Sequence, residues 1–350
     1  MEFAAAKALK HFVIEQKDYK IRPVSQGYIN TTFQILDGDQ TEFILQRING
    51  EVFPDVPAIM KNLKALIPLL RAENYHSISY MPTKARLPYY KDEEGGYWRL
   101  LTFVPDSVAF DYTKDPEVAY EAGRILGLFH KQLDGVSVEE FREVLPGFHN
   151  LNHRRQEYLN AFKQAKKERR QNALKEIEFA EETFLKLDKD IDSLSLRICH
   201  NDTKLNNFLF SKDTGKGLCL IDLDTVMPGR IIYDLGDIIR TLANPVPEDE
   251  KNLKTIGFDL KMVSSFLKGI EASELQLSDA EKQAIPAGVV LMPYLHGLRA
   301  LTDYLNNDVY YRISYPDHNL DRSRNLFYFT QLAFERSEAL LSLVEEILGH

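Results

Sequence analysis

The sequence predicts an α+β protein of two lobes, with a small antiparallel-sheet lobe at the N-terminus and a larger, mainly helical lobe after it. Three observations predict this division. A chain of 350 residues is long enough for about two domains or lobes. Strand patterns with turn signals dominate residues 19–104, whereas helical periodicity dominates from residue 115 onward. We therefore expect one lobe at residues 1–104 and the other at residues 105–350.

The N-terminal lobe is predicted from an amphipathic helix at the start of the chain, five short strands and one further helix. Turn signals such as Asp37-Gly38-Asp39 separate the strands. The strands are expected at residues 19–24, 28–36, 41–48, 86–90 and 97–104. Between the third and the fourth strand, Ile59, Leu63 and Leu70 recur at helical spacing and predict a helix over residues 57–72.

The C-terminal lobe is predicted to be mostly helical. Apolar residues at three-and-four spacing predict a helix over residues 118–133, and the charged segment 151–187 predicts one or two solvated helices within 150–190. Two apolar strands, 196–199 and 218–223, interrupt the helices. Helices return from residue 260 to the end, apart from an irregular aromatic stretch at 309–319.

The composition excludes several classes of protein. Hydrophobic residues make up 44% of the chain and charged residues 27%, as in ordinary globular proteins. The formal charge of −9 argues against nucleic-acid binding, which needs clustered Lys and Arg for phosphate contacts. No stretch approaches about 18 consecutive apolar residues, and the N-terminus lacks the apolar core of a signal peptide. We therefore expect a cytoplasmic protein without a membrane or nucleic-acid partner; the sequence does not indicate its oligomeric state.

Polar chemistry concentrates between residues 196 and 229. The loop after the first apolar strand carries Asp202, Lys204 and Asn207, which would be costly to bury there without partners. Asp222 and Asp224 stand at the end of the second apolar strand. Acid-bearing loops at the ends of neighbouring strands suit Mg²⁺, which prefers carboxylate, amide and phosphate oxygens.

The same window contains the groups that phosphoryl transfer requires: an Asp to accept a proton, an Asn and an Asp to hold metal, and a cation near the transferred phosphate. The spacing of Asp202, Lys204, Asn207 and Asp222 matches the catalytic and metal loops of the protein-kinase superfold. The pattern His-x-Asp, four residues, Asn, then Ile-Asp resembles more closely the aminoglycoside phosphotransferase and choline kinase branch. Within that branch, the segments that resemble N-acetylhexosamine 1-kinases are SQGYINTTF (25–33), FILQRIN (43–49), HNDTKLNN (200–207), IDLDTVMPG (221–229) and YDLGDIIR (233–240).

The resemblance implies a role for each of these residues. Asp202 would be the catalytic base, and Lys204 would neutralise charge that develops in the transition state. Asn207 and Asp222 would hold magnesium, and Asp224 would either reach a second metal or cap a turn. We interpret His200 as the structural histidine that fixes the loop, and Asp234 and Asp237 as hydrogen-bond acceptors behind the site.

The resemblance also implies a nucleotide site for ATP in the N-terminal lobe. The turn at Gly27 and Tyr28 would cover the phosphates, helped by Asn30 and Thr31. Arg47 would reach the α- and β-phosphates, with Gln46 as the alternative register. Phe103 and Val104 would form the hinge that contacts adenine. The ion pair that kinases usually form here is in doubt, because the helix over 57–72 contains no acidic residue and has Lys61 near the expected place.

The acceptor site is expected among the C-terminal helices. Residues 296–325 contain four Arg and four Asp, a balance that suits a neutral, hydroxyl-rich ligand better than a cation. By resemblance to the hexosamine kinases, Arg299, Asp303, Tyr304 and Tyr310 are candidates for sugar contacts. Each could instead belong to a structural salt bridge or to a packed aromatic cluster.

These observations lead to one working hypothesis: ATP- and magnesium-dependent, in-line phosphorylation of a free sugar at the anomeric hydroxyl of N-acetylglucosamine or N-acetylgalactosamine. One alternative is another small-molecule kinase of the same fold, acting on choline, an aminoglycoside or homoserine. A second is a haloacid-dehalogenase-type phosphatase with Asp222 as nucleophile and Asp224 as acid, although that motif normally opens its fold. A binding module without activity is disfavoured, because Asp202, Asn207 and Asp222 are all present.

Overall fold

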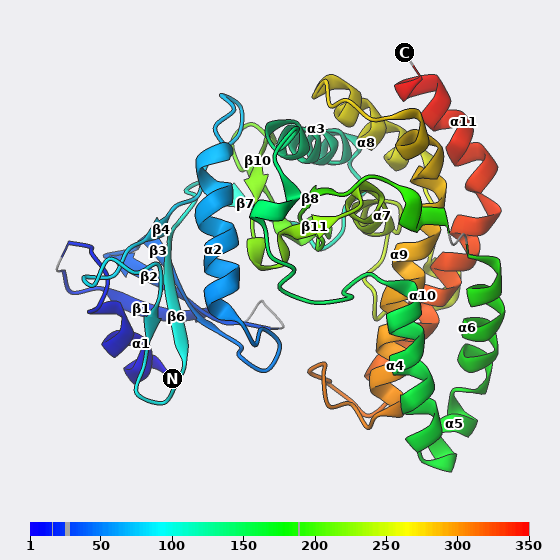
Figure 1. Ribbon diagram of the computed structural model, residues 1–350, viewed down its shortest axis with the longest axis horizontal. Helices are drawn as coiled ribbons and strands as arrows, with labels where there is room; N and C mark the ends of the chain where they lie inside the picture. Colours follow the sequence, from blue (N-terminus) through cyan, green and yellow to red (C-terminus); the bar gives the residue numbers. More distant parts are fainter. Residues whose placement is uncertain (16, 25–28, 188–189, 350) are drawn as a thin grey trace.

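The computed structural model describes residues 1–15, 17–24, 29–187 and 190–349. Figure 1 shows a sheet-containing lobe beside a larger helical lobe, with the N-terminus in the first and the C-terminus in the second. The predicted α+β, two-lobed architecture is therefore confirmed.

The N-terminal lobe is built on a six-stranded antiparallel sheet in the order β1-β2-β3-β6-β4, with β5 also paired to β6. Its strands are β1 (Lys20–Val24), β2 (Thr31–Asp37), β3 (Gln40–Ile48), β4 (Tyr80–Met81), β5 (Tyr90–Lys91) and β6 (Tyr97–Thr102). The strand expected at 86–90 is reduced to β5, because Arg86 has a positive φ of 62° that breaks an extended run. The two-residue β4 was not predicted, since so short a strand has no alternating pattern.

The two faces of this sheet have different neighbours. Leu45 of β3 packs with Phe33 and Trp98 in a small core beneath α1 (Glu2–Leu9). Ile44 and Ile48, which alternate with Leu45 along the strand, belong to the large core that continues into the helical lobe. Because side chains alternate along a strand, the position of a residue on β3 decides whether it faces the small core or the space between the lobes.

Helix α2 (Val56–Leu66) lies on the side of the sheet that faces the helical lobe (Figure 1). Asp55 caps its start by accepting the N–H of Ala58 at 2.9 Å. The helix ends at Leu66 rather than at the expected residue 72, because Pro68 lies in the following turn and has no N–H to continue it. Asn62, which is 1% exposed, donates to the carbonyl of Val226 at 2.9 Å and so ties α2 to the other lobe.

The helical lobe contains α3 to α11 and two small sheets. Its helices are α3 (Pro116–Gln132), α4 (Leu151–Gln164), α5 (Lys167–Asn172), α6 (Leu174–Lys186), α7 (Ile231–Leu242), α8 (Leu260–Ala272), α9 (Asp279–Leu305), α10 (His318–Glu335) and α11 (Ser337–Leu348). The charged segment forms three helices instead of one or two, because Ala165 takes an extended conformation and Ala173 leaves helical geometry.

The small sheets place the two loops of interest. One sheet has the order β10-β9-β7, and the other pairs β11 with β8. Their strands are β7 (Ser107–Val108), β8 (Arg197–Cys199), β9 (Phe208–Ser211), β10 (Gly217–Leu220) and β11 (Met227–Gly229). The two apolar strands of the sequence, β8 and β10, therefore lie in different sheets, and the expectation that they are neighbours is wrong. Each polar loop instead connects one small sheet to the other.

Helix α9 forms the centre of the helical lobe. By length and composition it could span a membrane, but 72% of its most apolar window is buried inside the fold. It packs against α7, α10 and α4 as a core helix. Its contact with α7 is very close: a Cβ on Gly236 would lie 2.3 Å from the carbonyl oxygen of Gly288.

The close approach of α7 and α9 predicts that Gly236→Ala lowers the free energy of unfolding by about 2 kcal/mol or more, because the two helices must separate to admit the methyl group. Urea denaturation would measure the loss. Gly50→Ala is the matched control, since a Cβ there meets nothing within 4 Å. Equal stability of the two variants would contradict the packing described here.

Candidate active site

The loop after β8 is held by the buried carboxylate of Asp234, in the first turn of α7. Its Oδ2 accepts the N–H of His200 at 2.8 Å, and its Oδ1 accepts the N–H of Asn201 at 2.7 Å. Thr203 donates its hydroxyl to the Asp234 carbonyl at 2.6 Å. Three hydrogen bonds to one residue, two before Asp202 and one after it, fix the backbone that leads into and out of Asp202.

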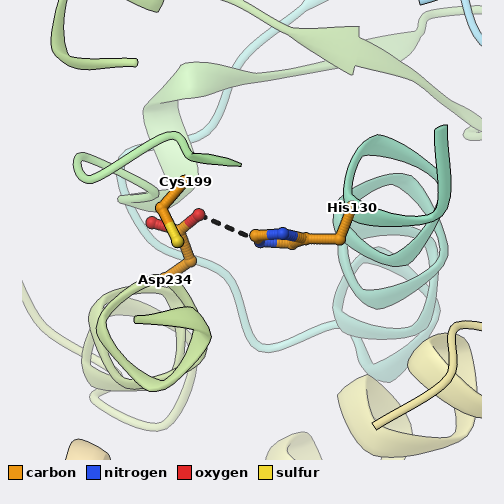
Figure 2. A group of neighbouring side chains, drawn as sticks. All are labelled: His130, Cys199 and Asp234. Atoms are coloured by element: carbon orange, nitrogen blue, oxygen red, sulfur yellow. Dashed lines mark hydrogen bonds and ion pairs between the residues drawn. The ribbon is translucent and has the colours of Figure 1, made fainter. Parts of the chain in front are cut away.

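Asp234 is supported from behind by a buried histidine. Figure 2 shows His130 of α3 pointing at Asp234, with Nε2 and Oδ2 3.0 Å apart, and Cys199 beside them. By residue type and spacing, these three side chains could hold a metal ion. Because both Asp234 oxygens already accept N–H groups from the loop after β8, we interpret the cluster as hydrogen-bonded support for that loop.

His200 and Asn201 connect the loop after β8 to the loop after β10. His200 donates from Nε2 to the carbonyl of Ile221 at 2.9 Å, while its Nδ1 accepts the N–H of Asp202 at 3.2 Å. Both ring nitrogens are thus engaged, as expected for a structural histidine. Asn201 has a φ of 62° and donates its side-chain amide to the carbonyls of Thr225 and Met227. Sequence reasoning missed Asn201, although Asn is among the few residues that tolerate this backbone geometry.

The structure brings Asp202, Lys204 and Asn207 together. Lys204 Nζ lies 3.1 Å from Asp202 Oδ2, and Asn207 Nδ2 donates to the same oxygen at 3.0 Å. Burial opposes ionisation of Asp202, but the charge of Lys204 outweighs it and lowers the pKa of the carboxyl. Among the described residues, Oδ1 of Asp202 has no partner. It is therefore free to accept a proton from a hydroxyl group.

Asp222 lies next to this group in an unusual backbone conformation. Its φ of 59° and ψ of 53° are left-handed, and β10 ends at Leu220, three residues before the expected strand end. The N–H of Ile221 donates to the carbonyl of Asn207 at 2.9 Å and joins the two loops. Desolvation and the nearby charge of Asp224 raise the pKa of Asp222 to about 6.

The donor set at Asn207 and Asp222 fits a divalent cation. Asp222 makes no hydrogen bond or ion pair with any described residue, and Asn207 engages its amide nitrogen, so that its amide oxygen is available. A raised pKa means that the carboxylate of Asp222 lacks sufficient positive charge around it. A bound cation would supply that charge through oxygen ligands.

Asp224 has a different partner from either of the expected ones. It forms a buried ion pair with Arg99 of β6, and each side chain is 1% exposed. Arg99 also donates from Nη2 to Asp224 Oδ2 at 3.0 Å, and Asn30 donates to the same oxygen at 2.9 Å. Both oxygens of Asp224 are thereby committed to the N-terminal lobe. The structure assigns Asp224 to an inter-lobe ion pair rather than to a second metal or a turn cap.

The expectation for Arg47 is wrong, because the residue lies on the other face of β3. Its guanidinium is 4.0 Å from Asp92, on the same side as Leu45 and the small core. Gln46, the alternative register, points to the inter-lobe side and accepts two N–H groups of Arg99 at 2.9 and 2.8 Å. Neighbouring residues of a strand face opposite sides of the sheet, so a difference of one position places the Arg47 guanidinium away from the site.

The other N-terminal residues expected to bind nucleotide lie in different surroundings. Gly27 and Tyr28 lie outside the described residues. Asn30 bridges the lobes, accepting the N–H of Asn49 at 3.0 Å and donating to Asp224 as described above. Thr31 is exposed at the start of β2.

The chain leaves the sheet at Phe103 and Val104, where the hinge is expected. The N–H of Phe103 donates to the carbonyl of Glu42 at 3.0 Å, so it remains bound to the sheet. Val104 is buried, and its carbonyl accepts the hydroxyl of Ser107 at 2.7 Å. An adenine contact at either residue stays a prediction.

Two of the four expected sugar contacts lie together on the helical lobe. The guanidinium of Arg299 lies 4.8 Å from the centre of the Phe148 ring and hydrogen-bonds Tyr310, whose side chain is 47% exposed. Burial opposes the charge on Arg299, but Tyr311, Tyr310 and Asp202 overcome it and raise its pKa. Arg299 is therefore charged and interacts electrostatically with Asp202.

Asp303 does not face a ligand. It is 4% exposed, and its carboxylate accepts the N–H groups of Val309, Tyr310 and Tyr311 at 2.8–2.9 Å, together with the amide of Asn319 at 2.9 Å. Four donors fill the acceptor sites of a carboxylate. The expectation of a sugar contact is wrong, and Asp303 instead shapes the loop that carries Tyr310.

Tyr304 is also structural. It is 1% exposed, and Arg169 lies 4.5 Å from the centre of its ring. Arg169 further pairs with Asp308 at 2.6 Å and so closes the same loop from the outside. The alternative of a packed aromatic and ionic cluster, left open by the sequence, is the one found.

The chain belongs to the phosphotransferase enzyme family, whose model matches residues 20–256. Similar solved structures include a microcompartment-associated aminopropanol kinase, with 15% identity, 97% of this chain and 98% of that chain covered, and a TM-score of 0.67. An amicoumacin kinase in complex with AMP-PNP, Ca²⁺ and Ami has 15% identity, coverage of 96% and 93%, and a TM-score of 0.60. Choline kinase from Cryptosporidium parvum Iowa II has 15% identity, coverage of 100% and 99%, and a TM-score of 0.60. The fold is thus that of small-molecule kinases.

The inter-lobe ion pair predicts a specific pattern of stability changes. Arg99→Met should lower the free energy of unfolding by about 3 kcal/mol or more, because it leaves the Asp224 carboxylate buried without its partner. The double variant Arg99→Met with Asp224→Leu should recover most of that loss, since it removes both charges. Guanidinium denaturation of the three proteins would measure the coupling, and purely additive losses would show that the two side chains do not interact.

Proposed function

We propose that this phosphotransferase uses ATP and magnesium to phosphorylate a free sugar at its anomeric hydroxyl, with N-acetylglucosamine or N-acetylgalactosamine as acceptor, in the cytoplasm. Its nucleotide would lie between residues 1–104 and 105–350. The observation that carries the proposal is the geometry at Asp202: one carboxylate oxygen is held by Lys204 and Asn207, and the other is free. The segments that resemble N-acetylhexosamine 1-kinases include this loop and the loop of Asp222.

The free oxygen of Asp202 would accept the proton of the sugar hydroxyl as that hydroxyl attacks the γ-phosphorus of ATP. The bond from γ-phosphorus to the bridging oxygen breaks in the same step, and ADP leaves with the electron pair. Lys204, whose pKa is raised above its ordinary value because Asp202 and Asp222 outweigh burial, would balance the negative charge on the transferred group. No residue is needed as a phosphate carrier.

Asn207 and Asp222 would hold the magnesium ion, which when bound would neutralise phosphate charge. The structure of amicoumacin kinase with AMP-PNP and Ca²⁺ supports a nucleotide and a divalent cation in this fold. The buried pair of Arg99 and Asp224 would keep the N-terminal lobe in register with the metal loop. Phe103 and Val104 remain the proposed adenine contacts, and Gly27, Tyr28 and Thr31 the proposed phosphate contacts.

The charge near the base supports a neutral acceptor. Arg299 is charged and close enough for Asp202 to influence its pKa, and Tyr310 accompanies it. Choline and aminopropanol, which name two of the similar kinases, carry a positive charge that Arg299 would repel. A sugar offers hydroxyl groups that can accept hydrogen bonds from the guanidinium.

The phosphatase alternative gains no support from the structure. In that mechanism Asp224 would act as a general acid, but both of its oxygens are held by Arg99 and Asn30 in a buried ion pair. Such a carboxylate cannot deliver a proton to a leaving group without breaking the contact between the lobes.

The proposed base predicts that Asp202→Asn reduces kcat by about 100-fold or more, because an amide cannot accept the hydroxyl proton. The KM for ATP should change little, since Asp202 contacts no described residue of the N-terminal lobe. A coupled assay of sugar-dependent ADP release would measure both constants. Near wild-type turnover would remove Asp202 from the reaction.

The acceptor class is tested by a screen of ADP release over N-acetylhexosamines, hexoses, hexosamines, choline, aminopropanol and aminoglycosides. We expect N-acetylglucosamine or N-acetylgalactosamine to give the highest kcat/KM, and the cationic acceptors to give little above background. Preference for choline or an aminoglycoside would retain the kinase and reject the sugar.

A further inference from the structure

A small pocket opens next to the catalytic loop, and the reaction described above does not use it. Its volume is about 60 Å³, and it is lined by the catalytic loop, the end of α7, the segment that follows and α10. A buried water needs roughly 10–15 Å³ measured in this way, so the pocket can hold a small polar group with a few atoms around it. Lys204 contributes to its wall and also pairs with Asp202, which connects the pocket to the base.

Two amide oxygens in the wall have no hydrogen-bond partner. Asn244, just after α7, is 6% exposed, and its Oδ1 is buried and unpaired. Asn206, in the catalytic loop, also has a buried and unpaired Oδ1. The Nδ2 of Asn206 donates to Asp111 at 3.1 Å, which fixes the orientation of that amide. An unpaired buried acceptor costs about 1–3 kcal/mol, so two of them in one pocket indicate a ligand that donates hydrogen bonds.

The charges around the pocket select the kind of donor. Arg240 and Glu248, both in the wall, pair with each other, and each has a second partner, Asp237 and Arg322 respectively. The carboxylate of Glu248 is therefore already neutralised. Lys204 stays protonated, because Asp202 and Asp222 raise its pKa against the effect of burial. The remaining carboxylate of the wall, Asp111, already accepts the amide of Asn206. An ammonium group would lie close to the cations of Lys204 and Arg240, whereas a hydroxyl group can donate to the amide oxygens without this repulsion.

The pocket also has an apolar part. Its apolar lining residues are Val246 and, on α10, Leu326 and Phe329. A carbon skeleton that carries hydroxyl groups satisfies both kinds of surface, with its C–H groups on the apolar side chains and its hydroxyls on the amides.

We propose that this pocket receives hydroxyl groups of the acceptor other than the one that is phosphorylated, and that Asn206 and Asn244 determine acceptor specificity by accepting hydrogen bonds from them. The inference rests on the proposed function, because the pocket is joined to the base through Lys204. It adds a second recognition point, separate from Arg299 and Tyr310. The hydroxyl at Asp202 is then aligned by contacts on the rest of the sugar.

The test replaces Asn244 by Leu, a side chain of similar shape without the unpaired oxygen. We expect the KM for N-acetylglucosamine to rise about tenfold, which corresponds to the loss of roughly one hydrogen bond, while the KM for ATP stays unchanged. Thermal unfolding should show equal or higher stability, because an unpaired buried oxygen is removed. Asn244→Ala provides a second variant if the larger side chain disturbs the fold.

Ser323→Ala is the matched control. Ser323 of α10 is fully buried with an unpaired hydroxyl, but it does not line the pocket. Its replacement should leave both KM values unchanged. An equal rise of the acceptor KM in Ser323→Ala and Asn244→Leu would overturn the proposal, and so would a rise in the KM for ATP instead of the acceptor.

Deoxy sugars identify the contact itself. The analogues are 3-deoxy, 4-deoxy and 6-deoxy N-acetylglucosamine. With the wild-type enzyme, we expect at least one of them to have a kcat/KM about tenfold below that of N-acetylglucosamine. With Asn244→Leu, that analogue and N-acetylglucosamine should have equal kcat/KM values. If each analogue loses as much with the variant as with the wild type, the pocket does not bind these hydroxyls and the inference is wrong. Absence of any sugar turnover by the wild-type enzyme would instead reject the proposed function, so the two failures are distinguishable.

Discussion

The structure depends on one buried carboxylate, that of Asp234. It binds the backbone of His200 and Asn201 on one side and the ring of His130 on the other, so the loop of Asp202 cannot shift without breaking hydrogen bonds in a dry interior. The position of Asp234 follows in turn from the packing of α7 on α9, which the facing glycines permit. The helical core thereby fixes the geometry of the site within the larger lobe.

A second constraint acts between the lobes. Arg99 and Asp224 are oppositely charged, buried, and drawn from different lobes, so removal of either would leave the other charge buried without its partner. Asp222 is only two residues away from Asp224, and the charge of that neighbour, together with desolvation, raises the pKa of its carboxyl. The placement of the N-terminal sheet and the electrostatics of the loop after β10 are therefore linked through one ion pair.

The local part of the site could be predicted from the sequence, and its long-range part could not. Asp202, Lys204 and Asn207 lie within six residues of one another, so their spacing alone indicated their proximity, which the structure shows. Arg47 failed because the face of a strand depends on register, and Asp303 failed because an acid near an active site can equally serve a loop. The partners of Asp224, Asn30 and Arg99, are 194 and 125 residues away in the chain, a pairing that no local pattern reveals.

The central claim is that Asp202 activates the anomeric hydroxyl of a free sugar for direct attack on ATP. The most direct measurement is the identification of the product by nuclear magnetic resonance, after incubation of the protein with ATP, magnesium and N-acetylglucosamine. The account predicts a phosphorus signal coupled to the anomeric proton of the sugar. Coupling to the protons at carbon 6, or free inorganic phosphate as the only new product, would contradict it.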